Sequence, residues 1–250
     1  MKLIISPAKT MKLSSGWTGA LTRPVFLSKT ERLRDIIRGL SYAEQKKLWK
    51  CNDKIAQLNR ERFEKMDLGT GLTPAVIAYD GIQYNHISPL SMSADQTGYL
   101  QEHLCILSAF YGALKPFDGI VQYRLEMNTR SDIFGKIGLY GFWEDKIYRE
   151  VIPQDRTIIN LASKEYSKCI EKHLRPDDLF ITVSFAEKQG NRFINKSVYA
   201  KIARGEMVKY LSSVNTSDPE QIKSFEYDGY SFSEKDSDKT SFVFVRERNE

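Results

Sequence analysis

The sequence predicts a mixed α/β fold, in which helices flank one mixed β-sheet. Apolar runs of strand length, such as residues 104–111, alternate along the chain with segments whose apolar residues recur at helical spacing. Hydrophobic residues make up 41% of the chain, which is enough for a substantial core. No Gly/Ser-rich linker and no internal repeat divides the 250 residues, so we expect a single compact domain over residues 1–250.

The composition argues against several classes of protein. No apolar run approaches the ~20 residues of a membrane helix, and no signal-peptide hydrophobic region follows Met1. The three cysteines, Cys51, Cys105 and Cys169, are odd in number and their spacings match neither a disulfide framework nor a zinc knuckle. We therefore expect a cytoplasmic protein with reduced, mostly buried thiols, no bound metal or cofactor and no membrane contact. Without a heptad pattern or a large apolar stripe, a monomer is expected.

The first quarter of the chain predicts a strand followed by short helices. Residues 2–6 form an apolar run that ends in the turn Pro7-Ala-Lys-Thr10, and residues 12–27 lack periodicity. Capping boxes at 28–31 and 41–44 each predict the start of a helix, because the Ser hydroxyl and the Glu carboxylate each satisfy a free backbone amide. Asn52 or Asp53 is expected to cap a third helix.

Helices and strands continue to alternate through the rest of the chain. Four strands are expected at 75–79, 104–111, 123–127 and 157–160, the second of them central to the sheet. Four helices are expected at 93–103, 142–151, from Ser163 and at 197–211, with a short one at 218–220. Two hairpins are expected, one pairing 179–186 with 192–195 around Gly190-Asn191 and one pairing 225–232 with 242–246.

The basic residues are concentrated in the N-terminal quarter. Residues 1–65 hold 15 Lys and Arg against 6 Asp and Glu, whereas the remainder holds 22 against 26. A basic face of this kind can bind a polyanion, although it can equally be a solvated helical surface. The candidates for contact with DNA are Lys46, Lys47, Lys50, Lys54, Arg60 and Arg62.

Polar side chains follow or lie on most of the expected strands. Ligand sites in α/β sheets commonly lie where strands end, and charged groups within apolar strands are costly unless they are paired or functional. We therefore expect an anion pocket in which Glu126 is a partner or a base. Its candidate residues are Ser6, Lys9, Lys115, Arg124, Glu126, Asn160, Lys201 and Arg204. The alternatives are that Arg124 and Glu126 pair for strand register, that Lys201 and Arg204 are plain surface residues, and that Lys9 is an incidental turn residue.

Several of these motifs together resemble the YaaA peroxide-stress protein family. The resemblance runs from residue 3 to the segment Gly229-Tyr-Ser-Phe232. The motifs that carry it are Ile5-Ser-Pro-Ala-Lys-Thr10, Leu107-Ser-Ala-Phe-Tyr-Gly112 with Leu114-Lys-Pro116, Tyr123-Arg-Leu-Glu-Met127, Ile159-Asn-Leu-Ala-Ser163 with Glu165-Tyr166, and Tyr199-Ala-Lys201 with Ala203-Arg-Gly205.

The resemblance implies a bacterial cytosolic protein that protects DNA and proteins from hydrogen peroxide by limiting the unincorporated iron that drives Fenton chemistry. It also implies a mixed α/β fold, a positively charged cleft, a helix-hairpin-helix-like element near the N-terminus and binding of double-stranded DNA. The segment expected to form the hairpin is 55–59, where Gln57 stands in place of a glycine. Phosphate contacts there are left to Lys54, Arg60 and Arg62.

Three functions remain open at this stage. A DNA-binding stress protein predicts duplex affinity that falls steeply with salt. An enzyme for a small anionic substrate predicts that the candidate side chains converge on one pocket, with Lys9 as a nucleophile or an electrostatic stabiliser. Direct iron binding has the weakest basis, because no motif spacing supports its available ligands. Those ligands include Asp80, His86, Glu126 and Glu165.

Overall fold

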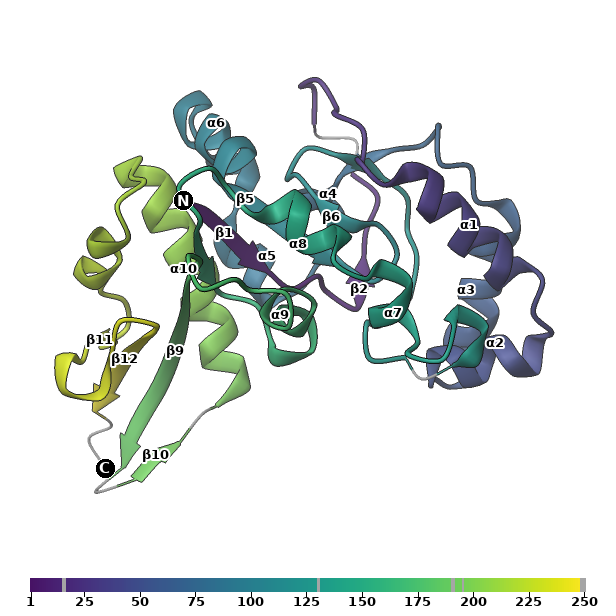
Figure 1. The fold of residues 1–250 in the computed structure, drawn as a ribbon. Coiled ribbons are helices and arrows are strands. Elements are labelled where there is room, and N and C mark those ends of the chain that lie inside the picture. The colour runs from purple at the N-terminus through teal and green to yellow at the C-terminus, as the bar shows by residue number, and fades with distance from the viewer. Residues whose placement is uncertain (15–16, 130, 190–191, 195, 248–250) are drawn as a thin grey trace.

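A mixed β-sheet forms the centre of the computed structural model, which describes residues 1–14, 17–129, 131–189, 192–194 and 196–247 (Figure 1). Within these residues the sheet has the order β11-β12-β9-β8-β1-β5-β6, and β10 pairs with β9. The strands are β1 (Lys2–Ile5), β5 (Leu104–Ser108), β6 (Gly112–Leu114), β8 (Thr157–Asn160), β9 (Leu179–Gln189), β10 (Arg192–Ile194), β11 (Ser231–Phe232) and β12 (Ser241–Glu247). The predicted mixed α/β class is confirmed.

The topology of the sheet reverses at β1. From β1 the chain passes to β5, which is parallel to β1 on one side, and later to β8, which is parallel to β1 on the other side. β9 and β12 then continue outward from β8 in the same parallel sense. The carboxyl end of β1 is therefore a topological switch point, which in open α/β sheets is where ligands bind.

Helices cover the sheet because its central strands are apolar throughout. Leu3, Ile4 and Ile5 of β1 have no exposed surface. The long helix α10 (Ser197–Val214) packs on β9, on α5 (Ile82–Ile87) and on α6 (Ala94–His103). Elsewhere in the fold, α8 (Lys146–Val151) packs on β6 and on α9 (Lys164–Glu171). Near-continuous apolar runs are typical of parallel strands that are buried on both faces.

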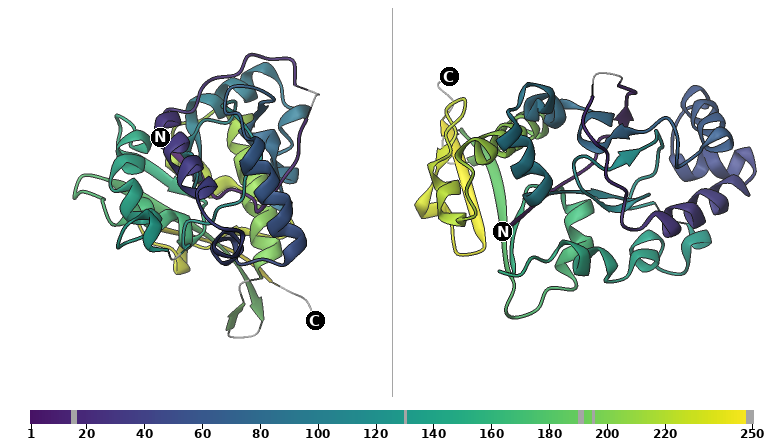
Figure 2. Two further views of the ribbon diagram at one scale, coloured as in Figure 1. Left: turned by 90° about the vertical axis from the view of Figure 1, so that its right-hand side faces the viewer. Right: turned by 90° about the horizontal axis from the view of Figure 1, so that it is seen from above.

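The N-terminal helices lie at one end of the molecule and the β11–β12 hairpin lies at the other (Figure 1, Figure 2). The predicted Ser41 capping box opens α2 (Tyr42–Trp49), and the Asn52 side chain caps α3 (Asp53–Lys65), as expected. The capping box at Ser28 is wrong, because α1 (Leu27–Arg38) already begins one residue earlier behind Phe26. The Phe26 ring packs 5.6 Å from the ring of Trp143, so tertiary packing fixes this helix start.

Residues 75–79 do not form the expected strand. Ala75–Ala78 is the short helix α4, and only Tyr79–Asp80 (β4) is extended, paired with β2 (Thr10–Met11). The amides of Ala75 and Val76 donate to carbonyls of Asp118 and Pro116, which satisfies the start of the helix. A short apolar run that is buried on all sides carries no periodicity to separate helix from strand.

Two further strand predictions also needed correction. Residues 123–127 alternate between buried and half-buried, as predicted, but they form no strand with any part of the chain that the structure describes. The central strand ends at Ser108 instead of residue 111, since the chain turns there to form β6 antiparallel to β5. The remaining short elements are β3 (Thr73–Pro74) and β7 (Gly119–Ile120), which pair with each other.

The later elements follow the prediction with altered limits. The expected 142–151 helix is two helices, α7 (Leu139–Trp143) and α8, which are separated at Glu144, whose φ is +50°. The β9–β10 and β11–β12 hairpins are both antiparallel pairs, as expected. Gly190-Asn191, the predicted turn of the first hairpin, and Asn195 lie outside the described residues. The short 3-10 helix Pro219–Ser224 begins after Asp218, which caps it.

Residues 55–59, which were expected to supply a hairpin, are helical and lie inside α3. The turn between α2 and α3 falls earlier, at residues 50–52, where Lys50 has a φ of +46°. The helical propensity of 53–65 and the Asn52 cap place the start of α3 before Gln57. The chain therefore has two helices with a tight join in this region, and the join carries a lysine.

Candidate functional site

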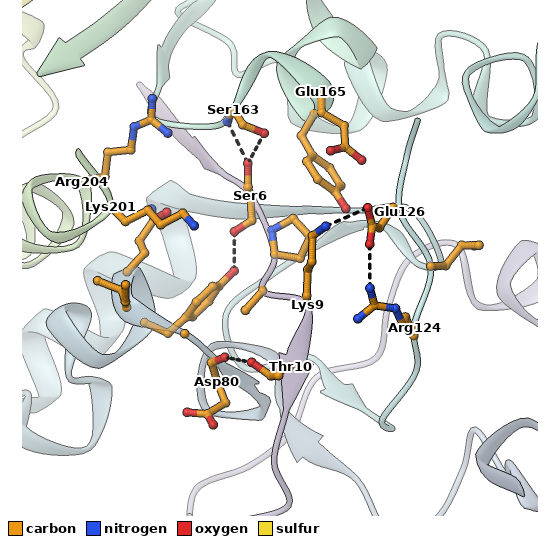
Figure 3. A pocket seen from close by; sticks show the side chains of 18 of the residues that line it. Ser6, Lys9, Thr10, Asp80, Arg124, Glu126, Ser163, Glu165, Lys201 and Arg204 are labelled. Atoms are coloured by element: carbon orange, nitrogen blue, oxygen red, sulfur yellow. Dashed lines mark hydrogen bonds and ion pairs between the residues drawn. The ribbon is translucent and has the colours of Figure 1, made fainter. Parts of the chain in front are cut away.

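A cavity of about 500 Å³ opens at the carboxyl end of β1, the topological switch point of the sheet (Figure 3). We call it the β1 cavity. Its walls come from the turn after β1, from α5, from the 123–126 segment, from the start of α9 and from α10. Its lining residues are Ser6, Pro7, Ala8, Lys9, Thr10, Asp80, Gly81, Ile82, Gln83, Tyr84, Tyr123, Arg124, Leu125, Glu126, Ser163, Glu165, Tyr166, Lys201 and Arg204.

The turn after β1 is held in place from both sides. The Ser163 amide donates to the Ser6 hydroxyl oxygen at 2.8 Å, and that hydroxyl lies 3.1 Å from the Ser163 hydroxyl. On the other side, the Tyr84 hydroxyl donates to the Ser6 carbonyl oxygen at 2.8 Å. The Thr10 hydroxyl donates to the carbonyl of Asp80. Neither hydroxyl partner of Ser6 is a base, so Ser6 positions the turn in this arrangement.

One carboxylate pairs with two cations at one end of the cavity. Glu126 Oε2 lies 3.0 Å from Lys9 Nζ, and Glu126 Oε1 lies 3.1 Å from an Nη atom of Arg124. The side chains of Arg124 and Glu126 are 16% and 24% exposed, whereas that of Lys9 is 66% exposed. Lys9 or Arg124 can bind an anion by exchanging its contact with the Glu126 carboxylate for a contact with the ligand.

The opposite end of the cavity carries two cations on one turn of α10. Lys201 and Arg204 project from this helix toward the turn that holds Ser6 (Figure 3). The helix approaches α5 closely because position 205 is a glycine: a Cβ there would lie 2.4 Å from the Gln83 carbonyl oxygen and 2.7 Å from the His86 Cβ. Burial lowers the pKa of the Arg204 guanidinium. Arg204 makes no hydrogen bond or ion pair with any described residue.

Buried tyrosines form the floor of the cavity. The Tyr123 hydroxyl lies 2.7 Å from the hydroxyls of both Tyr79 and Ser108, which gives a short hydrogen-bonded chain inside the protein. Burial raises the pKa of Tyr123 to about 12 and raises the pKa of Tyr84 well above its ordinary value. These hydroxyls therefore stay protonated at neutral pH and fix the floor beneath the charged walls.

Six of the eight anion-pocket candidates line the β1 cavity, and Lys115 and Asn160 do not. Lys115 follows β6, which runs antiparallel to β5, and so it lies at the opposite edge of the sheet beside Lys2. Asn160 does end a parallel strand, but it is buried, with its amide 3.3 Å from the Thr182 hydroxyl. Its oxygen accepts from the Ala162 amide, which makes it a structural residue of the β8–α9 turn.

Some wall residues were not among the site candidates, although Tyr166 stands in one of the family motifs. Gln83 and Tyr84 lie on α5, a helix that no capping box or periodic pattern predicted. Tyr166 lies on the inner face of α9 and is buried. The only sequence signal at Tyr84 was its place soon after the Asp80-Gly81 turn.

The iron-ligand candidates are divided between two places. Asp80, Glu126 and Glu165 line the cavity, whereas the His86 Nδ1 lies 2.8 Å from an oxygen of Glu206. Both oxygens of Glu126 already contact cations, and Glu165 accepts from the Asn128 amide. Within the described residues, no group of three or more His, Cys, Asp and Glu side chains is arranged to hold a metal ion.

The candidates for DNA contact lie on α2 and α3. Lys46 and Arg60 are each paired with an acid, Asp53 at 2.7 Å and Glu64 at 2.7 Å. Arg62 is half-buried, and burial lowers its pKa. Three exposed lysines form no ion pair with any described residue, and we call them the α2–α3 corner. They are Lys47, Lys50 and Lys54.

The join between α2 and α3 lies within electrostatic range of one end of the β1 cavity. The Cys51 thiol, between the two helices, is close enough to feel the charges of Arg124 and Lys46 as well as that of Glu126. Burial is nevertheless the larger influence and raises its pKa. Charges at one end of the cavity are therefore felt at the join between the two helices, although Arg124 lies far from Cys51 along the chain.

The model of the family described as "Peroxide stress protein YaaA" matches residues 1–236. The chain belongs to the YaaA peroxide-stress family. Family membership gives it a general role in the peroxide stress response and confirms the resemblance carried by its motifs. None of the described helices is both long and apolar enough to cross a membrane.

Full-length relatives agree with this assignment. A UPF0246 protein from Agathobacter rectalis is 48% identical over 98% of this chain and 99% of its own length. The UPF0246 protein DSY0297 from Desulfitobacterium hafniense is 46% identical over 98% of each chain. A third, from Lachnoclostridium phytofermentans, is 43% identical over 98% of this chain and 96% of its own.

Proposed function

We propose that the protein acts in the cytoplasm to limit Fenton-type damage during peroxide stress, and that it does so as a monomer bound to double-stranded DNA. The observation that carries this proposal is the α2–α3 corner, where Lys47, Lys50 and Lys54 are exposed and pair with no acid among the described residues. The neighbouring Cys51 lies within electrostatic range of Arg124, a cation of the β1 cavity. In this proposal the protein does not bind iron itself. Its effect on iron-driven damage is indirect and results from covering the DNA.

Unpaired lysines are suited to a phosphate backbone. Each phosphate that a lysine neutralises releases a condensed counterion, so affinity falls with salt in proportion to the number of contacts. Lys46 and Arg60 contribute less, because each must first give up an acid at 2.7 Å. The corner contacts backbone rather than bases, and low sequence specificity is expected.

The test is duplex affinity measured across a series of salt concentrations. The triple variant K47Q/K50Q/K54Q should bind more weakly, and the slope of log affinity against log salt should fall by about 2–3. The matched control is K209Q/K235Q/K239Q, which removes the same charge from exposed positions on α10 and the β11–β12 connection. Equal losses in both variants would reduce the effect to net charge and reject a defined DNA face.

A second candidate is an enzyme for a small anionic substrate, which the dimensions of the β1 cavity favour. A volume of about 500 Å³ lies in the range of small-molecule sites, and Lys9, Arg124 and Glu126 converge there. The test is to incubate the protein with a panel of small anions and to follow their conversion by mass spectrometry. Turnover that E126Q loses while keeping affinity supports this candidate, and absence of any conversion rejects it.

A further inference from the structure

The β1 cavity contains buried hydrogen-bond donors without acceptors. Gln83 Nε2, Arg124 Nε and Arg204 Nε are each buried, and none has a hydrogen-bond partner among the described residues. Gln83 is only 7% exposed as a whole residue. Buried donors in folded proteins are nearly always satisfied, because each one left unpaired costs on the order of 1–3 kcal/mol. Three of them around one cavity call for a ligand that offers acceptors.

The charges of the cavity are divided unevenly between its two ends. Lys9 and Arg124 share the single carboxylate of Glu126, so each of these cations has an acid partner and the group keeps one positive charge. Lys201 and Arg204, at the other end, form no ion pair with any residue that the structure describes. A guanidinium that is largely buried without a counterion is unfavourable, and a bound anion would remove the penalty.

The start of α9 adds further donors beside this unpaired end. No side chain caps the helix, because the Ser163 hydroxyl is turned toward Ser6 instead of toward the helix amides. The free amides of a first helical turn attract an anion. Ser163, Ser6, Lys201 and Arg204 all line the cavity, and Figure 3 shows the two cations on the side of Ser6 opposite to Lys9 and Glu126.

We propose that Lys201, Arg204 and Gln83 form a subsite for a terminal phosphate group, the dianionic end of a phosphomonoester. The chemistry selects phosphate over carboxylate, since two unpaired cations match two negative charges and the several donors match three terminal oxygens. A small phosphorylated molecule and the 5′-phosphate at a DNA end present the same group. The subsite extends the proposed anion binding to the opposite end of the cavity and does not depend on the α2–α3 corner.

The first experiment measures binding of inorganic phosphate and of glycerol 3-phosphate by calorimetry and by the shift in Tm. The wild type should bind both saturably, with acetate at equal ionic strength at least tenfold weaker. R204Q and K201Q should each weaken phosphate binding by about tenfold or more. K209Q, which removes an exposed charge from the same helix outside the cavity, should bind like the wild type.

R204Q has a second expected property. Because it removes a buried charge that has no partner, the ligand-free variant should be at least as stable as the wild type while losing the response to phosphate. Lys201 is exposed, so K201Q keeps the test decisive if R204Q fails to fold. Equal phosphate shifts in wild type, K201Q and K209Q would be a general salt effect and would overturn the proposal.

A second experiment separates the two sources of phosphate. Short duplexes with a 5′-phosphate or a 5′-hydroxyl are compared for wild type and K201Q. If the wild type binds the 5′-phosphate duplex more tightly and K201Q loses this preference, the ligand is a DNA end. If both duplexes bind equally and glycerol 3-phosphate binds, the ligand is a small phosphorylated molecule. Failure of the duplex salt series with intact phosphate binding would reject the DNA-binding function and leave the subsite standing.

Discussion

Lys9 and Glu126 meet across 117 residues of sequence, with Lys9 Nζ 3.0 Å from Glu126 Oε2. The contact ties the turn after β1 to a segment that belongs to no strand. The same carboxylate holds Arg124 at 3.1 Å, so one acid sets the charge at this end of the β1 cavity.

Replacing Glu126 by Gln should strengthen anion binding. The amide cannot neutralise Lys9 and Arg124, and the loss of one negative charge within the cavity should tighten inorganic phosphate binding about two- to fivefold by calorimetry. The free energy of unfolding should change by less than about 1 kcal/mol, because Lys9 is 66% exposed. Glu102→Gln, an exposed site outside the cavity, is the control. Unchanged phosphate affinity in E126Q would contradict the assigned role of the carboxylate.

Gly205→Ala should destabilise the fold and disturb the cavity. The new Cβ would lie 2.4 Å from the Gln83 carbonyl oxygen, so α10 must move away from α5 at a cost of about 1–3 kcal/mol. Gly98→Ala is the matched control, because a Cβ at this helical position meets nothing within 4 Å. This variant should raise the free energy of unfolding by up to about 1 kcal/mol. Urea denaturation of both variants measures the difference, and a neutral G205A would show that the helices separate without strain.

Acid should weaken the C-terminal part of the sheet through Glu187. This buried carboxylate lies 2.5 Å from Arg246 and 2.9 Å from Lys196, and its hydrogen bond to Arg246 lowers its pKa. Because its pKa is lower in the folded state, the ionised carboxylate stabilises the fold at pH values above the ordinary glutamate range. This contribution is lost as the pH falls through the folded-state pKa. Glu187→Gln should cost roughly 2–4 kcal/mol at pH 7.

Comparing the wild type with E187Q across pH supplies the control for this pH dependence. Denaturation from pH 7 down to pH 3 should show the stabilities of wild type and E187Q converging as the wild-type carboxylate becomes protonated. A difference that stays constant over this range would assign the effect to packing instead of charge.

The thiols should react slowly despite the stress role of the family. Burial raises the pKa of Cys105 and of Cys169 to about 12, and it also raises that of the half-buried Cys51. Because the thiolate is the nucleophile, the native protein at pH 7 should react with a disulfide reagent more slowly than glutathione does. Cys51 should react first, and all three should react at the free-thiol rate in denaturant. A native thiol faster than glutathione would instead indicate a peroxide-sensing cysteine.

Local signals were sufficient for the elements whose ends are fixed by neighbouring residues. The capping box at Ser41 and the cap at Asn52 act within one helical turn and are present as predicted, and the helix expected from residue 93 begins with a capping box at Ser93. At Ser28 the same pattern failed, because packing of Phe26 on Trp143 set the helix start instead. A capping motif specifies a start only where no distant contact competes for it.

The sequence determined which residue types would gather at the end of β1, because apolar strands followed by Ser, Lys, Arg and Glu can be recognised from neighbouring residues alone. Only the tertiary structure decided which of them meet. Lys115 lies at the opposite edge of the sheet because β6 runs antiparallel to β5. Asn160 is buried and does not line the cavity. Glu126 pairs with Lys9 and Arg124, whereas Lys201 and Arg204 pair with no described acid, and the close approach of α10 to α5 at Gly205 holds them in the cavity wall. Charge balance depends on contacts between residues distant in sequence, which the order of residues alone does not fix.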